Sequence, residues 1–167
     1  MLSKKDKIIT FVNRNLEPYR GYHQFMRSLP LIFEENPDVQ VFIIGASGKG
    51  YGADPPEGQT WKDIFLQEVE EKIDISRVHF LGLIDYNDLI SLLQVTSVHV
   101  YLSYPFVLSW SFLEAMACGT PAIVSDQGAL PEVVRNGETG YVLPIDQGTE
   151  PWLHAMACLC DDYRLRS

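Results

Sequence analysis

The sequence contains few cysteines and no long apolar run, and each absence excludes a class of protein. The cysteines are Cys118, Cys158 and Cys160, an odd number without a C-x-x-C pair, so we expect reduced thiols and neither a disulfide framework nor a zinc site. No stretch is apolar over the roughly 20 residues that a transmembrane helix requires, and the N-terminus lacks the apolar core of an export signal. We therefore expect a soluble, cytoplasmic protein.

Basic residues are in the minority. The 167 residues include 13 Lys and Arg against 22 Asp and Glu, a net charge of −9, which argues against nucleic acid as a partner because a phosphate backbone attracts a basic face. The chain also lacks the P-loop, the dinucleotide-binding G-x-G-x-x-G and the G-x-S-x-G nucleophile elbow. Its four histidines include no i, i+4 pair of a helical metal site. We expect no metal and no other cofactor.

Short β-rich runs alternate with helical patterns along the whole chain. Buried strands are expected at 7–12, 39–45, 77–82, 97–103, 121–125 and 140–144. Helices are expected at 22–36, 61–73, 85–95, 109–119, 128–136 and 150–166. This alternation predicts a Rossmann-like three-layer α/β/α domain with a six-stranded parallel sheet. Pro30 lies inside the first helical pattern and should kink or break that helix.

Ligands of such sheets bind beyond the carboxyl ends of the strands. Arg14 and Arg20 follow the first strand, and two guanidinium groups on one loop can clamp an anion. Pairing of these arginines with surface carboxylates such as Glu17 fits the spacing equally well. Gly45 ends the second strand, where a glycine would let a ligand approach the backbone. We expect the glycine-rich segment from Lys49 onward to be a flexible loop.

The helix expected at 109–119 places Glu114 among apolar neighbours. A buried carboxylate is costly unless it is paired, so Glu114 either faces water at the surface or binds a ligand. The first turn, Ser109 to Ser111, would offer free backbone N–H groups and the positive end of the helix dipole to a phosphate.

The segment "FLEAMACGTPAIVSDQGALPEVV" (112–134) resembles the signature of family four of the retaining glycosyltransferases, which have two Rossmann lobes in the GT-B architecture. "FVNRNLEPYRG" is similar to that family's first phosphate loop, "RVHFLGLID" to its nucleobase loop and "NGETGYVLP" to its last strand. The resemblance implies that residues 1–167 are the nucleotide-sugar-binding C-terminal lobe. The acceptor-binding N-terminal lobe would be absent, and the isolated lobe would be inactive.

The resemblance also implies roles for individual residues. Arg14 and Arg20 match the basic pair that grips the donor diphosphate during catalysis, and Glu114 matches the glutamate that hydrogen-bonds the ribose hydroxyls. The positions that the resemblance places at the donor substrate are Asn13, Gly45, Leu83, Phe106, Ser109, Trp110 and Glu114. The implied donor is a nucleoside diphosphate sugar such as a UDP-sugar, used in polysaccharide biosynthesis. Peripheral membrane association through the missing lobe stays open.

Phe106 departs from the family pattern. The family has a glutamate with seven residues between it and the position of Glu114, and that glutamate normally contacts the donor sugar. This chain has "FVLS" from Phe106 onward. A variant subgroup of transferases is the interpretation we favour. A non-catalytic nucleotide-sugar-binding module and a sugar-nucleotide 2-epimerase are the alternatives.

Overall fold

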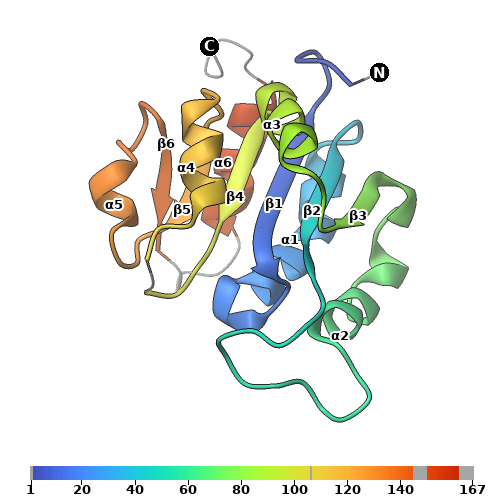
Figure 1. The fold of residues 1–167 in the computed structure, drawn as a ribbon. Coiled ribbons are helices and arrows are strands. Elements are labelled where there is room, and N and C mark those ends of the chain that lie inside the picture. Colours follow the sequence, from blue (N-terminus) through green and yellow to red (C-terminus); the bar gives the residue numbers. More distant parts are fainter. Residues whose placement is uncertain (1, 106, 145–149, 162–167) are drawn as a thin grey trace.

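The computed structural model describes residues 2–105, 107–144 and 150–161. These residues form a six-stranded sheet with helices on both faces (Figure 1). The strands are β1 (Ile8–Asn15), β2 (Gln40–Ala46), β3 (Val78–Gly82), β4 (Val98–Tyr101), β5 (Ala122–Ser125) and β6 (Gly140–Leu143). The α-helices are α1 (Tyr22–Glu35), α2 (Trp61–Gln67), α3 (Tyr86–Val95), α4 (Trp110–Ala117), α5 (Leu130–Val133) and α6 (Glu150–Asp161). Short 3-10 helices are η1 (Pro18–Arg20), η2 (Glu70–Lys72) and η3 (Ile75–Arg77).

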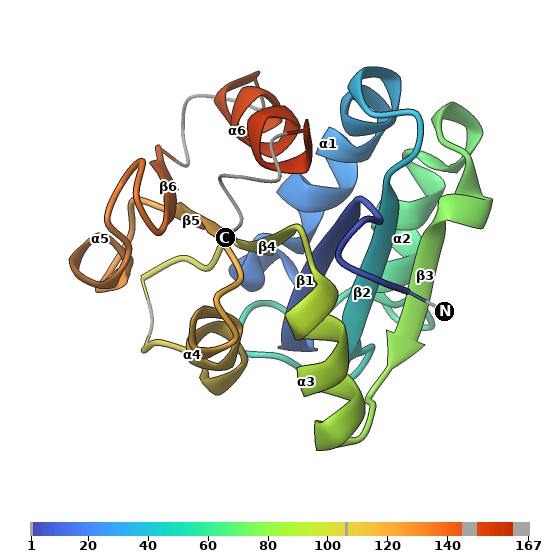
Figure 2. The same cartoon turned by 90° about the horizontal axis from the view of Figure 1, so that it is seen from above.

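The strands are parallel and follow the order β3-β2-β1-β4-β5-β6. This is the order of doubly wound nucleotide-binding folds, so the predicted three-layer α/β/α architecture is confirmed. Figure 2 shows α1 and α6 over one face of the sheet and α3 and α4 over the other. None of the described helices is long and apolar enough to cross a membrane.

Alternate side chains of β1 pack against the two opposite faces of the sheet. Ile9 and Phe11 belong to the large core cluster that includes the buried residues of α1. Ile8 and Val12 belong to a second cluster with Leu92 of α3. Because successive side chains of a strand point to opposite faces, a continuous apolar run such as this one is typical of a strand covered on both sides.

Pro30 does not break α1, which runs from Tyr22 to Glu35. The proline removes one backbone hydrogen bond, but apolar side chains before and after it, Met26, Leu29, Ile32 and Phe33 among them, are buried in the same core cluster. Burial of a continuous helical face stabilises the helix enough to retain the proline.

Helix α2 ends well before the residue expected from its apolar pattern. The sequence predicts a helix to Ile73, whereas α2 ends at Gln67 and a 3-10 turn follows. Three acids, Glu68, Glu70 and Glu71, stand where the helix would continue. Negative charge near the C-terminal end of a helix opposes its dipole, which favours early termination.

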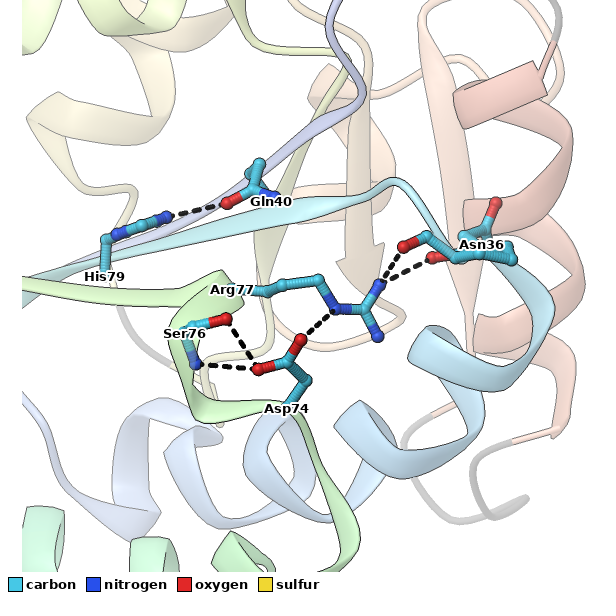
Figure 3. Close-up of polar contacts among 7 residues, drawn as sticks. Asn36, Gln40, Asp74, Ser76, Arg77 and His79 are labelled. Carbon is cyan, nitrogen blue, oxygen red and sulfur yellow. Dashed lines mark hydrogen bonds and ion pairs between the residues drawn. The ribbon is translucent and has the colours of Figure 1, made fainter.

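Arg77 joins the end of α1 to the start of β3 at the amino edge of the sheet (Figure 3). Its Nη1 donates to the carbonyl oxygens of Asn36 and Pro37, and its Nε lies 3.8 Å from Asp74 Oδ2. The guanidinium carbon is 3.8 Å from the ring centroid of Phe33. These contacts give Arg77 a structural role, remote from the carboxyl ends of the strands.

His99 is completely buried in β4. Its Nδ1 is 3.0 Å from the hydroxyl oxygen of Thr10, and its Nε2 has no hydrogen-bond partner among the described residues. Burial disfavours the charged ring and lowers the pKa of His99 from 6.5 to about 4. Between these two pH values only the unfolded chain binds the proton, so the folded state loses stability as the pH falls through this window.

Lowering the pH from 7 to 5 should therefore cost the chain about 2 kcal/mol of unfolding free energy through His99. The double variant Thr10→Val/His99→Leu removes the titrating ring together with its hydroxyl partner, so its stability should fall by about 2 kcal/mol less over the same range. Urea unfolding at both pH values measures the difference. An identical pH dependence of the two proteins would contradict the assignment.

Candidate functional site

The carboxyl ends of β1 and β4 are neighbours at the centre of the sheet. After β1 the chain passes through η1 into α1 on one face, and after β4 it enters α4 on the opposite face (Figures 1 and 2). This is the topological switch point, the place where open α/β sheets bind their ligands. The candidate site is therefore built from the segments that follow these two strands.

A close contact between Gly21 and Leu102 holds η1 against the end of β4. Gly21 has a φ of 76°, and a Cβ there would lie 2.3 Å from Leu102 Cβ and 2.5 Å from its carbonyl oxygen. The backbone N–H of Tyr104 also donates to the carbonyl oxygen of Tyr19 at 3.2 Å. A glycine is required here by both its conformation and its lack of a side chain.

Arg20, the residue before that glycine, is held over β4 and is only 7% exposed. Its Nη1 donates to the Ser103 hydroxyl at 3.0 Å and to the Tyr101 hydroxyl at 3.3 Å. The ring centroid of Tyr51 lies 5.1 Å from the guanidinium carbon, within the range of a cation–π contact. These contacts orient the guanidinium group at the switch point.

Asn13 and Arg14 belong to the strand and not to the loop that the sequence suggested, because β1 continues to Asn15. The side chain of Arg14 is exposed. Asn13 is 6% exposed, and its Nδ2 has no hydrogen-bond partner among the residues that the structure describes. An unpaired buried donor costs about 1–3 kcal/mol, so an anionic ligand oxygen at this position would be favourable.

Gly45 is buried at the end of β2, and the protein itself fills the space beside it. A Cβ at this position would lie 2.7 Å from the carbonyl oxygen of Asn13 and 2.8 Å from Leu16 Cδ2. The sequence suggested that this glycine leaves room for a ligand. In the structure it leaves room for the end of β1.

Glu17 does not behave as the surface carboxylate that the sequence suggested. It is 2% exposed, and its oxygens accept hydrogen bonds from the backbone N–H groups of Tyr51 and Gly52. The segment after β2 is thereby bound to the segment after β1.

Helix α4 begins at the switch point with a side-chain cap. The Ser109 hydroxyl oxygen accepts a hydrogen bond from Phe112 N at 3.1 Å, a common N-cap arrangement. Trp110 is the first helical residue and is 81% exposed. The first N–H groups of a helix lack intrahelical acceptors, so this end of α4 can bind an anion.

Glu114 lies in the second turn of α4 and is half-buried. Phe112 and Ala115 on the same helix are fully buried. Burial and the charge of Glu114 both raise the pKa of the Cys118 thiol, one turn further along. Glu114 therefore carries a partly shielded charge on the helix that follows β4.

The sequence-predicted positions fall into groups within the fold. Asn13 and Gly45 lie near the ends of the adjoining strands β1 and β2, and Arg20 lies in η1, which follows β1. Trp110 and Glu114 lie in α4, which Ser109 caps, and Leu83 follows β3, two strands from β1. Leu83 is 72% exposed. Phe106 lies outside the described residues.

Two residues that orient Arg20, Tyr101 and Ser103, were missed by sequence reasoning. Together with His99 they place polar groups at every second position of "HVYLS", and alternate residues of a strand share one face. This alternation was the available signal. It was hidden because the same stretch also fits a buried strand.

A cavity of about 270 Å³ lies away from the candidate site, near the amino ends of β5 and β6. Its lining includes Met116, Gly119, Thr120, Gly137, Tyr141 and Leu159. Across the described ranges, no three His, Cys, Asp or Glu side chains gather as a metal site would require.

Comparison with protein families matches residues 2–164 to the family described as "Glycosyl transferases group 1". The chain is also similar to D-inositol 3-phosphate glycosyltransferase of Corynebacterium glutamicum, with 29% identity over 163 residues. That alignment covers 96% of this chain and 36% of the relative. The chain thus spans about a third of the length of the curated relatives that it matches.

The fold is found in solved structures, among them the following two. Sucrose-phosphate synthase from Thermosynechococcus elongatus superposes with a TM-score of 0.78 and 26% identity, covering 99% of this chain and 39% of that one. HepE of Anabaena, in complex with UDP-glucose, superposes with a TM-score of 0.78 and 21% identity, covering 96% of this chain and 41% of that one. The chain therefore has the fold of one lobe of larger, GT-B proteins.

Gly21→Ala should destabilise the chain more than Gly119→Ala. Both glycines have positive φ, 76° and 73°, but only a Cβ at position 21 would meet other atoms. The left-handed conformation should cost each variant about 1–2 kcal/mol, and overpacking should add about 1–3 kcal/mol at position 21. Urea unfolding of the two variants provides the comparison, and equal losses would refute the steric role of Gly21.

Proposed function

The chain belongs to the family of glycosyl transferases group 1, and on this premise we propose that it is the donor-binding lobe of a retaining GT-B glycosyltransferase. The lobe binds a nucleoside diphosphate sugar, and the sugar passes to an acceptor hydroxyl bound by a second lobe. The UDP-glucose in the complex of the structural neighbour HepE supports a UDP-sugar as donor.

The orientation of Arg20 is the observation that carries this proposal. Its guanidinium is held at the switch point by Tyr101 and Ser103, where doubly wound folds bind nucleotides. The unpartnered amide of Asn13 on the neighbouring strand supplies a donor for the same ligand. A cation and a buried amide donor suit a diphosphate better than a neutral ligand.

Cleavage of the donor's glycosidic bond leaves the bonding electron pair on the diphosphate. Arg20 is already in position to offset this charge, and the exposed Arg14 can close on the ligand from β1. The N-terminal end of α4 adds backbone N–H groups, whose partial positive charge also stabilises the diphosphate. Glu114, on that helix, accepts hydrogen bonds from the ribose hydroxyls.

Phe106 favours a second candidate function, a module that binds nucleotide sugars without turnover. The family's glutamate at this position contacts the donor sugar, and phenylalanine cannot accept a hydrogen bond. Donor hydrolysis by the two-lobed protein separates the candidates. We expect slow release of free sugar that is lost in Arg14→Ala, whereas binding without any release would support the module.

Calorimetric titration of the chain with UDP, GDP and ADP tests the binding function directly. We expect at least one nucleotide to bind, and UDP to bind most tightly. Arg14→Ala and Arg20→Ala should each weaken that binding by about tenfold or more, because each removes a charge-assisted hydrogen bond to phosphate.

Arg135→Ala is the matched control for this titration. Arg135 is an exposed arginine that pairs with Glu138 at 3.2 Å, far along the chain from the candidate site. Its loss should leave nucleotide binding unchanged. Failure of the native chain to bind any of the three nucleotides would overturn the proposed function.

A further inference from the structure

The loop between β2 and α2, residues 47–60 and here called the glycine loop, is attached to the end of β1 at two points. Asn15 Nδ2 donates to the carbonyl oxygen of Lys49 at 2.9 Å. Both Glu17 oxygens accept from Tyr51 N, at 3.1 and 2.9 Å, and one of them also accepts from Gly52 N at 2.9 Å. The loop is therefore anchored by side chains that are remote in sequence.

Gly50 shows how closely the glycine loop surrounds the Glu17 carboxylate. A Cβ at position 50 would lie 2.0 Å from Glu17 Oε2, so the glycine lets the loop backbone approach the carboxylate this closely. Since Glu17 is 2% exposed, the backbone N–H groups of the loop take the place of the water that would otherwise solvate this charge.

The anchored loop brings Tyr51 to Arg20. The N–H group that Glu17 binds belongs to Tyr51, whose ring centroid is 5.1 Å from the Arg20 guanidinium carbon. Tyr101 and Ser103 contact the same guanidinium from β4. Arg20 is thus held between the glycine loop and the strand end.

We propose that Glu17 is a positioning residue that fixes Tyr51 against Arg20 and thereby sets the orientation of the diphosphate-binding guanidinium. The effect of Glu17 on donor binding follows only if the proposed function holds, and in this respect the inference rests on that function. The contacts from Glu17 to the loop and from Tyr51 to Arg20 are observed independently of any ligand.

The charge of the Glu17 carboxylate strengthens the contact, because hydrogen bonds to an ionised acceptor are stronger than those to a neutral one. Oε2 accepts from Tyr51 N and Gly52 N, and Oε1 accepts from Tyr51 N alone. A glutamine would keep one acceptor oxygen, lose the charge and turn an NH2 group toward Tyr51 N. Glu17→Gln keeps the size of the side chain and weakens the anchor by removing its charge and one acceptor oxygen. Glu57→Gln makes the same change on an exposed carboxylate of the same loop and is the matched control.

Modification of Arg20 by phenylglyoxal, located by peptide mass spectrometry, tests the inference without a nucleotide. Glu17→Gln should raise the Arg20 modification rate by about tenfold, the change expected when a charged hydrogen bond that closes the loop is lost. The rate at the exposed Arg135 should stay constant and serves as an internal reference. Equal Arg20 rates in Glu17→Gln, Glu57→Gln and the native chain would overturn the inference.

Calorimetry with UDP then tests the consequence. Glu17→Gln and Tyr51→Ala should each weaken UDP binding about tenfold, and the double variant should bind like Tyr51→Ala, because Glu17 acts through Tyr51. Additive losses in the double variant would contradict this route, since they are expected if Glu17 contributes only general stability. A native chain that binds no UDP, GDP or ADP would overturn the proposed function, and the modification rates would still decide the role of Glu17.

Discussion

The approach of Gly21 to Leu102 is the contact on which the arrangement of the site depends. It lets the chain turn from the end of β1 directly over the end of β4, where a Cβ would already collide with the backbone. The turn carries Arg20 into contact with Tyr101 and Ser103. A cation is thereby buried at the switch point of a parallel sheet, the position at which this class of fold binds ligands.

The ends of the first two strands form a single polar unit. Asn15 and Glu17 bind backbone groups of the loop after β2. That loop places the Tyr51 ring next to the Arg20 guanidinium. Burying a carboxylate and a guanidinium is costly unless each is fully hydrogen-bonded. Backbone N–H groups offset part of this cost for the acid, and the Tyr101 and Ser103 hydroxyl groups and the Tyr51 ring offset part of it for the base.

The sheet could be predicted from the sequence because its strands are continuous apolar runs, whose pattern is local. Because these runs also locate the carboxyl ends of the strands, Arg20 and the helix carrying Glu114 could be assigned to the ligand-binding edge of the sheet. The end of α2 was not predicted, since Glu68, Glu70 and Glu71 oppose the helix dipole while the apolar spacing continues. The burial of Glu17 was not predicted either. Its partners Tyr51 and Gly52 lie more than thirty residues away in the sequence, and no local sequence pattern indicates such a contact.

A crystal structure of the chain with bound UDP tests the central claim most directly. The account predicts the diphosphate at the carboxyl ends of β1 and β4, with its oxygens within hydrogen-bonding distance of Arg20 and of the first N–H groups of α4. A nucleotide bound instead in the cavity at the amino ends of β5 and β6, or a diphosphate without contact to Arg20, would contradict it.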